Sequence, residues 1–439
     1  MKLKTLLLGG VMAAAVAVPA MTSAAMAEDS LYIPLLTYRT GPFANSGIPI
    51  ANGMHDYFTM LNERDGGIGG VKLNVEECET GYNAEKGVEC YEGTKGKGAL
   101  IYNPYSTGIT LQLIPKASVD HIPVLSMGYG LSAAAVGEKF PWIFNMPATY
   151  WSQASAIIRY ISDQVGGLDK LKGKKIGYIY LDVGYGKEPI PLLQQFKDKY
   201  GFDLFLYPVA GKEMQNQSSV WLNVQRDNPD YMIMWGWGAM NPTAVKEAVN
   251  SGFDMSKFIG VWWSGANSDV SGSGDAATGY KSTNFHGTGF DYPALQDIKK
   301  YVIDKGKSQL KDFKEADANF YDRGVMNAVA VAEAIRTAQK MTGKKVIDAT
   351  DMRVGMENLN LTEARLAEIG LKDFTIPEHV TCKHHDGGDN PIFIQQWTGS
   401  GWKRVATVKP MYDVVWPMLE AAADKYVKDK PDWVTQTCK

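Results

Sequence analysis

The chain has 439 residues, of which 45% are hydrophobic and 21% are charged, and its formal net charge at pH 7 is −3. This length exceeds one ordinary hydrophobic core, so two domains are expected. Because the charge is nearly balanced and no basic cluster occurs, neither nucleic acid nor an anionic membrane surface is indicated as a partner.

The first residues have the pattern of a secretory signal peptide. Lys2 and Lys4 make a basic start, residues 6–20 are largely apolar, and residues 25–27 fit a small-x-small cleavage site. We expect residues 1–27 to be removed and the mature protein to be soluble and exported. No cysteine at the cleavage site would carry a lipid, and no later apolar run reaches the ~18 residues of a membrane span. No membrane anchor is therefore expected.

Strands and helices alternate in the pattern of the first part of the mature chain. Buried strands are expected at residues 31–36, 71–75, 99–102 and 123–126. Helices are expected at residues 50–62, 84–95 and 110–120, where apolar side chains recur at helical spacing. Such alternation indicates an α/β fold with a parallel sheet and right-handed crossovers.

The alternation then starts again. Helices are expected at residues 152–165, 190–200, 220–226 and 241–251, and strands at 175–180, 203–207, 231–235 and 258–262. After a polar stretch come expected helices at 293–304 and 322–341, and a hairpin of residues 392–397 and 402–408. Two separate series of this kind favour two similarly built lobes.

Four of the 11 tryptophans fall within 29 residues, in pairs where two of the expected strands end. They are Trp235, Trp237, Trp262 and Trp263. In open α/β sheets, ligands bind beyond the carboxyl ends of the strands. These tryptophans are therefore candidates for one wall of a ligand pocket, and core packing is the equally weighted alternative.

The chain has four cysteines, Cys78, Cys90, Cys382 and Cys438. In an oxidising compartment an even count indicates disulfides, and three pairings are possible. Nearness in sequence favours Cys78–Cys90, which leaves Cys382–Cys438. Free buried thiols are the alternative.

Short motifs follow one another in a characteristic order along the mature chain. They are residues 41–43 (Gly-Pro-Phe), 61–63 with 66–73, 103–108, 184–186 (Gly-Tyr-Gly), and 319–323 with the alanine-rich 328–334. In order and spacing they resemble the periplasmic solute-binding proteins of the leucine/isoleucine/valine type, which feed ABC importers. The resemblance implies the type I periplasmic-binding-protein architecture, an α/β fold with two similar doubly wound lobes. Hinge strands join the lobes, which close around one ligand.

The resemblance also implies that the chain crosses between the lobes three times. We expect residues 28–147 and 282–375 to form the first lobe. Residues 148–281 and 376–439 are expected to form the second lobe, the last segment including a C-terminal tail. The implied protein is a monomeric receptor without enzymatic activity or cofactor, and its partners are a small-molecule carboxylate and ABC permease subunits.

The family's ligands carry a carboxylate, and the resemblance implies where it is held. Hydroxyl and backbone N–H groups after the third strand correspond to Tyr105, Ser106 and Thr107, and those after the fourth strand to Ser126, Met127 and Gly128. A turn that runs into a helix N-terminus offers free N–H groups and a favourable dipole for an anion. Ser106 or Thr107 also suits a simple helix N-cap, and both roles are compatible.

In the second lobe, the resemblance assigns ligand contacts to Tyr185, to Trp237 or Met240, and to residues 261–266. Amino-acid-binding members have an acidic residue in the last segment, which pairs with the ligand's ammonium. Here that segment holds Trp262 and Trp263, and the nearest acid is Asp269. Because a buried unpaired ammonium costs several kcal/mol, an aromatic or other apolar carboxylate is favoured.

Three alternatives stay open at this point. A cationic, betaine-like ligand would be held on tryptophan faces by cation–π contacts. The same fold could bind a branched-chain or other amino acid. A different class altogether is an exported α/β enzyme, although no G-x-S-x-G elbow and no Cys/His pair marks a nucleophile.

Three residues around the first strand are further candidates. Arg39 could contact the ligand's acid, although a surface ion pair is the commoner role, and Tyr38 and Phe43 could form the lips of the cleft. Residues 384–386 (His-His-Asp) match no standard zinc spacing, so no metal site is expected.

Overall fold

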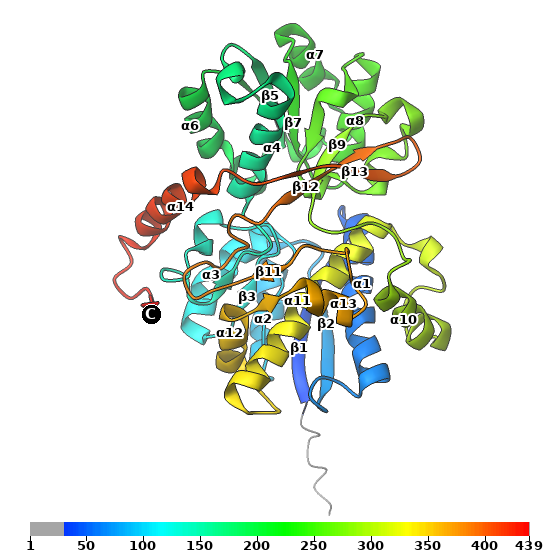
Figure 1. The fold of residues 1–439 in the computed structure, drawn as a ribbon, viewed down its shortest axis with the longest axis vertical. Coiled ribbons are helices and arrows are strands. Elements are labelled where there is room, and N and C mark those ends of the chain that lie inside the picture. Colours follow the sequence, from blue (N-terminus) through cyan, green and yellow to red (C-terminus); the bar gives the residue numbers. More distant parts are fainter. Residues whose placement is uncertain (1–29, 439) are drawn as a thin grey trace, which may run out of the picture.

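The computed structural model describes residues 30–438, so the expected signal peptide lies outside the described residues. Two α/β lobes lie one above the other, and each is built around a sheet flanked by helices (Figure 1). Within residues 30–438, no helix is long and apolar enough to cross a membrane. The expected α/β class and the two-lobed type I architecture are confirmed.

The sheet of the first lobe is parallel. β1 (Ser30–Thr37) pairs with β2 (Lys72–Glu79), and β3 (Val124–Leu125) pairs with β4 (Ile143–Phe144). Residues 99–102 join the two pairs, because the Leu100 N–H donates to the Tyr32 carbonyl and the Leu125 N–H donates to the Tyr102 carbonyl. The third expected strand therefore has ladder hydrogen bonds, although only Tyr102 has regular strand pairing.

The helices of the first lobe are α1 (Ala44–Asp65), α2 (Ala84–Lys95), α3 (Thr107–Asp120), α10 (Pro293–Tyr301), α11 (Ala318–Thr342), α12 (Ala349–Glu357) and α13 (Glu363–Glu368). α1 and α11 approach closely because each presents a glycine to the other's backbone. A Cβ on Gly53 would overlap the Tyr321 carbonyl, and one on Gly324 would overlap the Ile50 carbonyl. These glycines let the backbones of α1 and α11 pack directly against each other.

The second lobe has one seven-stranded sheet, in the order β13-β12-β9-β8-β7-β5-β6. Its parallel strands are β5 (Lys175–Leu181), β6 (Asp203–Val209), β7 (Tyr231–Trp235), β8 (Phe258–Gly260) and β9 (Lys281–Asn284). The antiparallel hairpin of β12 (Ile392–Trp397) and β13 (Trp402–Val408) adds to β9. Its helices are α4 (Tyr150–Val165), α5 (Gly184–Lys187), α6 (Ile190–Tyr200), α7 (Ser218–Asp227), α8 (Met240–Asn250) and α9 (Asn267–Val270).

Three chain segments connect the lobes, after β4, after β9 and before β12. The short pair β10 (Asn360–Leu361) and β11 (Glu378–His379) precedes the last of them. The His385 carbonyl still accepts from the Asn145 N–H of the first lobe, and the Gly387 N–H donates to the Pro147 carbonyl. The expected lobe boundaries stay a prediction.

The C-terminal part lies along both lobes. α14 (Tyr412–Val427) packs against α4 of the second lobe and against the 3₁₀ turn Ser132–Ala135 of the first. The tail then returns to the first lobe, where the Gln436 N–H donates to the Glu138 carbonyl.

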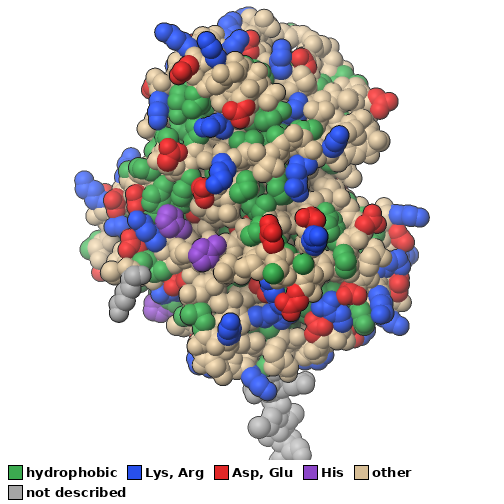
Figure 2. Space-filling model, in the orientation of Figure 1, with side chains coloured by type: hydrophobic (Ala, Val, Ile, Leu, Met, Phe, Trp, Pro, Cys, Tyr) green, Lys and Arg blue, Asp and Glu red, His purple; other side chains and the backbone are tan. Residues whose placement is uncertain are grey.

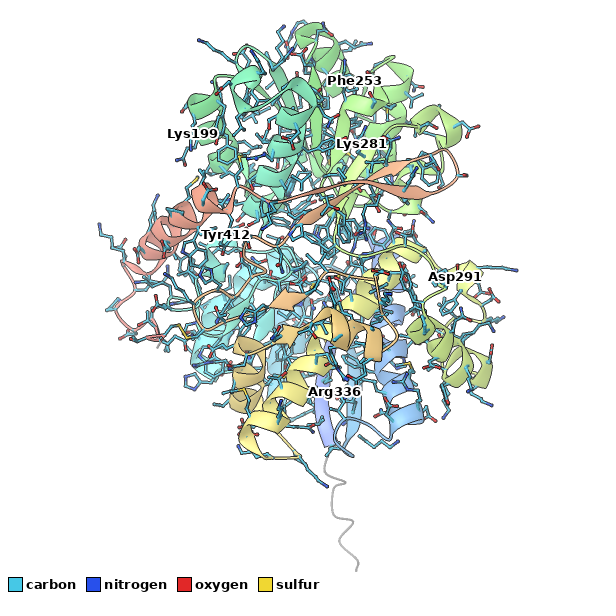
Figure 3. All side chains as sticks on the ribbon, in the orientation of Figure 1. Lys199, Phe253, Lys281, Asp291, Arg336 and Tyr412 are labelled. Carbon is cyan, nitrogen blue, oxygen red and sulfur yellow. A yellow bond between two sulfur atoms is a disulfide. The ribbon has the colours of Figure 1, made fainter. Side chains whose placement is uncertain are left out.

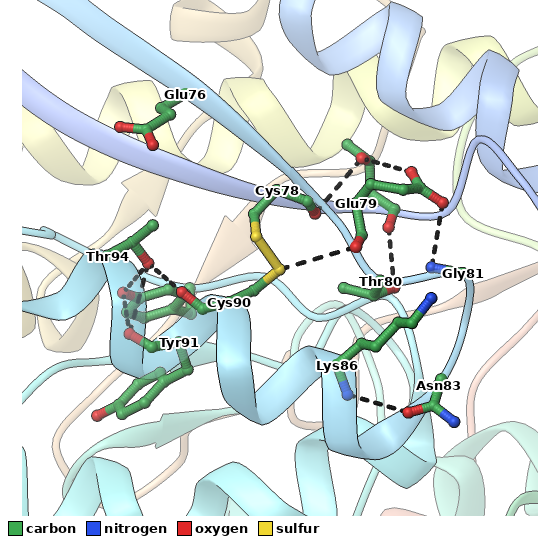
Figure 4. Close-up of a disulfide and its surroundings, with 12 residues drawn as sticks. Glu76, Cys78, Glu79, Thr80, Gly81, Asn83, Lys86, Cys90, Tyr91 and Thr94 are labelled. Atoms are coloured by element: carbon green, nitrogen blue, oxygen red, sulfur yellow. Dashed lines mark hydrogen bonds between the residues drawn. A yellow bond between two sulfur atoms is a disulfide. The ribbon is translucent and has the colours of Figure 1, made fainter.

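Both expected disulfides are present. Cys78–Cys90 joins the end of β2 to α2 (Figure 4), and Cys382–Cys438 fastens the tail to the segment before β12. Each pair has its Cα atoms 5.7 Å apart. The pairing favoured by nearness in sequence is confirmed, and no free cysteine occurs in the described chain.

Charged side chains are spread over the surface. On the face shown in Figure 2, acidic and basic groups are interspersed, and neither sign forms a continuous patch. This distribution gives no electrostatic reason for binding a large charged partner on that face.

Candidate functional site

A small cavity between the lobes has an almost wholly aromatic wall. The first lobe contributes Tyr82, Tyr105, Thr107 and Tyr129, and the second contributes Tyr150, Tyr185, Trp237 and Trp263. Side chains of both lobes fill the space between the two ribbons in Figure 3. The free volume is about 10 Å³, roughly the room that one water molecule needs. The lobes are therefore closed on each other, and a ligand must part them or displace side chains.

The turn before α3 positions the first-lobe wall. Tyr105 has a left-handed backbone (φ 48°), and its N–H donates to the Tyr129 hydroxyl at 2.5 Å. The Tyr129 hydroxyl in turn donates to the Asn103 side-chain oxygen at 2.5 Å. This network fixes two tyrosine rings beside the first residue of α3, Thr107, whose hydroxyl lies 3.1 Å from that of Tyr150.

The N-terminus of α3 has free donors, as expected for an anion site. The Ser106 hydroxyl caps the helix by accepting from the Ile109 N–H at 3.3 Å. Among the described residues, no acceptor is bonded to the N–H groups of Thr107 and Gly108. The N-cap role of Ser106 is thus observed, and two donors remain for a ligand or water.

The carboxyl ends of β7 and β8 bring two tryptophans together at the second-lobe wall. β8 ends at Gly260 because the chain turns into the 3₁₀ turn Trp262–Ser264, two residues before the expected strand end. The rings of Trp237 and Trp263 meet edge to face with centroids 5.3 Å apart. Trp235 is instead fully buried beside Tyr150 and Tyr178 and does not line the cavity.

Closure is marked by contacts across the cleft at the same place. The Trp263 indole N–H donates to the Gly128 carbonyl of the first lobe at 3.2 Å. Gly128 has φ +64°, and a Cβ there would lie 3.0 Å from the Trp262 ring. Phe43 stacks toward Trp237 from the first lobe, with ring centroids 6.5 Å apart.

Five of the expected ligand contacts line the cavity: Tyr105, Thr107, Tyr185, Trp237 and Trp263. Seven do not line it: Ser106, Ser126, Met127, Gly128, Met240, Trp262 and Arg39. The Ser126 hydroxyl donates to the Tyr129 carbonyl, and Met127 and Met240 are fully buried. The ligand contacts of all twelve residues stay predictions.

Arg39 already has protein partners. Its guanidinium donates twice to Glu77 and once to the Asn52 side chain, each at 2.7 Å. Tyr38, beside it, is buried, and its hydroxyl has no hydrogen-bond partner. The ion pair considered for Arg39 is therefore the arrangement that the structure shows.

A wider outer cavity adjoins the inner one. It has a volume of about 310 Å³ and shares Tyr82, Thr107 and Tyr185 with the inner cavity. Its other lining residues are Phe43, Ala84, Ser106, Gly108, Leu111, Leu181, Val183 and Gly184. This mostly apolar space leads from the free end of α3 to the aromatic wall.

Sequence reasoning did not single out Arg323, which lies on α11 beside Trp262 and Trp263. Its side chain is fully buried, and its three guanidinium nitrogens have no hydrogen-bond partner. The guanidinium carbon is 4.3 Å from the Trp262 ring centroid and 4.9 Å from that of Trp263. Burial lowers the pKa of Arg323 to about 10, so the group stays charged at neutral pH.

Two buried carboxyl groups lie near the closed cleft. Asp269 accepts from the Asn241 amide and the Ala266 N–H, and burial raises its pKa to about 7. Glu188 of the second lobe accepts from the Ser132 N–H of the first at 2.8 Å, and burial raises its pKa to about 7. Neither lines the inner cavity.

The His384–Asp386 segment has an internal structural role. The His385 ring contacts the Ile143 carbonyl at 2.8 Å, and Asp386 accepts from the Tyr412 hydroxyl at 2.9 Å. Within residues 30–438, no group of three His, Cys, Asp or Glu side chains is arranged to hold a metal ion.

Comparison with known proteins places this site in a family context. A model of the family described as periplasmic binding protein matches residues 30–401. The chain is 37% identical to a protein of the Pseudomonas fluorescens group whose crystal structure is described as an ABC transporter permease. That match covers 94% of this chain and 100% of the other, with a TM-score of 0.86. No curated protein matches the chain.

Two more distant structures share the fold. A branched-chain amino acid ABC transporter protein from Thermus thermophilus with bound valine is 18% identical, covers 90% of this chain and 99% of its own, and has a TM-score of 0.74. A solute-binding protein from R. palustris in complex with benzoate is 14% identical, with 87% and 97% covered and a TM-score of 0.64. At these identities the likeness concerns the fold alone.

Proposed function

Because this chain belongs to the periplasmic binding protein family of ABC-transporter solute receptors, we propose that it captures a small aromatic or apolar carboxylate. Hinge closure of the two lobes in the periplasm would enclose the ligand, and an ABC permease would receive it. The observation that carries the proposal is the inner cavity, whose wall holds seven aromatic side chains and no Asp or Glu.

The aromatic wall favours an apolar ligand body. Aromatic rings give large apolar contact area and pair edge to face with a further ring. An α-amino acid would bring an ammonium into this wall, where no carboxylate meets it. Asp269, the nearest acid in sequence, already accepts two hydrogen bonds from the protein. A branched-chain amino acid is thus the weaker candidate.

The first-lobe side favours an acid group on the ligand. Thr107 and Gly108 offer free N–H groups at the N-terminus of α3, where the helix dipole attracts an anion. Both residues line the outer cavity, so a ligand entering there meets them.

A quaternary ammonium ligand is the second candidate, because a cage of aromatic faces without charged groups suits such cations. Arg323 argues against it. Its buried positive charge lies 4.9 Å from the Trp263 ring centroid and would repel a cation held against that ring.

Thermal unfolding with a panel of ligands tests the proposal. We expect benzoate, 4-hydroxybenzoate or phenylacetate to raise the melting temperature, and leucine and glycine betaine to leave it unchanged. At 100 times its Kd, a ligand stabilises the folded protein by about 2.7 kcal/mol. A shift with leucine or betaine but with none of the acids would refute the proposal. Chemical conversion of a bound acid would indicate an enzyme instead.

A further inference from the structure

We infer that Arg323 binds the ligand's carboxylate and makes closure of the lobes depend on a negative charge in the ligand. The inference rests on the proposed function and adds the residue that distinguishes an acid from its neutral analogue. Arg323 belongs to α11 of the first lobe, whereas Trp262 and Trp263, which flank its guanidinium, belong to the second. The tryptophan rings therefore come to flank the Arg323 guanidinium only when the lobes close.

The closed structure leaves this guanidinium without acceptors. An arginine has five N–H donors, and buried donors in native proteins are nearly always hydrogen bonded. Here the side chain is 0% exposed, yet Nε, Nη1 and Nη2 have no partner. Arg323 does not line the inner cavity, but it contacts Trp263, which does. The closed form therefore leaves the guanidinium without a hydrogen-bond acceptor from the described chain.

No side chain of the described chain is in place as the counter-ion. Within residues 30–438, Arg323 forms no ion pair, in contrast to Arg39, which pairs with Glu77. Asp269 is held by Asn241 and the Ala266 N–H. Asp322, next in sequence, accepts from the Gly289 N–H at 2.9 Å. Asp269 and Asp317 attract the guanidinium only from beyond hydrogen-bond distance, so the hydrogen-bonded acceptor that it lacks is assigned to the ligand.

A ligand carboxylate has the required geometry. The planar guanidinium fork donates two parallel hydrogen bonds to a carboxylate, and the flanking aromatic rings exclude water from the pair. When the lobes part, Trp262 and Trp263 leave and water can hydrate Arg323. If the lobes close without an anion, Arg323 loses its hydration and gains nothing. If they close on a carboxylate, hydrogen bonds to the carboxylate replace that hydration.

The α3 N-terminus is the competing anion site, and it differs in access to water. Thr107 and Gly108 line the outer cavity of about 310 Å³, which has room for water on their N–H groups. Their donors can be satisfied with or without a ligand. Only the ligand relieves the desolvation cost that Arg323 bears on closure, so we assign the larger part of the charge selectivity to Arg323.

The test compares benzoate with benzamide, which has similar shape and no charge, by titration of tryptophan fluorescence. We expect the wild type to bind benzoate at least 30-fold more tightly than benzamide. In Arg323→Gln this preference should fall to within threefold, and in Arg323→Lys it should fall in part because the fork is lost. Arg353→Gln is the matched control. Arg353 also stacks on a tryptophan, Trp142 at 4.7 Å, but it is hydrogen bonded to Glu357 and Gln436.

The outcomes separate the two proposals. If Arg323→Gln keeps the wild-type preference for benzoate, the inference fails while the carboxylate receptor stands. An equal loss for benzoate and benzamide would indicate a merely structural role and also overturns it. If the wild type binds neither compound, both proposals fail for this ligand class.

A crystal structure of the wild type with benzoate needs no variant to fold. The carboxylate oxygens are expected about 2.7–2.9 Å from the Arg323 guanidinium. A carboxylate bound instead to the N–H groups of Thr107 and Gly108, with Arg323 left alone, would refute the assignment.

Discussion

Replacing Trp263 with alanine removes a residue that belongs both to the cavity wall and to the contacts across the closed cleft. The side chain is only 5% exposed, and within its own lobe it meets Trp262 and Trp237 at ring-centroid distances of 4.6 and 5.3 Å. Across the cleft it meets Tyr129 at 5.8 Å and Arg323 at 4.9 Å. Only the contacts across the cleft form when the lobes close.

The loss in binding follows from the contacts across the cleft. The indole hydrogen bond to Gly128 contributes about 0.5–1.5 kcal/mol. The ring pair with Tyr129 adds about 0.5–1.5 kcal/mol, and the desolvated cation–π contact with Arg323 adds up to about 2 kcal/mol. A combined loss of about 2–4 kcal/mol corresponds to affinity roughly 30-fold to 1,000-fold weaker.

The assay measures benzoate affinity by calorimetry and stability by thermal unfolding. Trp263→Ala should also unfold at lower temperature, because truncating a buried tryptophan costs about 3–5 kcal/mol. Trp221→Ala is the matched control, since Trp221 is 2% exposed and packs on Phe253 and Phe258 of the same lobe, away from the cleft. Unchanged affinity in Trp263→Ala, or an equal loss in the control, would refute the reasoning.

Two further changes probe the closed cleft, and a third probes the disulfide between β2 and α2. Gly128→Ala should weaken benzoate binding at least tenfold, because the backbone has φ +64° and the new Cβ would lie 3.0 Å from the Trp262 ring. Unchanged affinity would contradict this close approach of Gly128 to Trp262. Burial in the closed form raises the pKa of Glu188 to about 7 from its usual value near 4.5, so closure takes up a proton. Benzoate affinity should therefore fall as pH rises from about 5 to 7, by up to about tenfold per pH unit. Glu188→Gln should flatten that slope in titrations at several pH values. Cys78→Ser should lower the unfolding free energy in urea by about 3 kcal/mol, because the disulfide to Cys90 closes a loop of 12 residues; a loss below 1 kcal/mol would argue against it.

The sequence predicted most elements of both lobes because their apolar residues repeat at strand or helix spacing. α2 and α6 have the expected bounds, and both disulfides pair as nearness suggested. β4 and β9 were not expected, since strands of two and four residues are too short to show a period. α14 was also missed although it has 16 residues, because Pro417 interrupts its helical pattern.

The site was predicted less completely than the fold, for a physical reason. Trp237 and Trp263 could be found because parallel strands end at one edge of the sheet, a rule that depends on local order alone. Tyr129 and Tyr150 belong to different lobes and reach the cavity only through closure. Arg323 lies in the motif that suggested the family, but its lack of partners is a property of the packed interior. The one available signal was a charged pair, Asp322 and Arg323, at the start of a long helix whose next turns are mostly apolar.

The tryptophans and Arg323 together determine the charge that the cleft selects. Family members that bind amino acids place an acid opposite the ligand's ammonium, and the corresponding segment here carries Trp262 and Trp263. Replacing the acidic residue with tryptophan would by itself only remove the preference for a cationic ligand. The structure adds a buried guanidinium 4.3 and 4.9 Å from the two rings, which places the field of a positive charge at that wall, and Asp269 and Asp317 oppose it only from farther away. A site with this field stabilises an anion and repels an ammonium, which is why the ligand class should follow from Arg323 as much as from the aromatic wall.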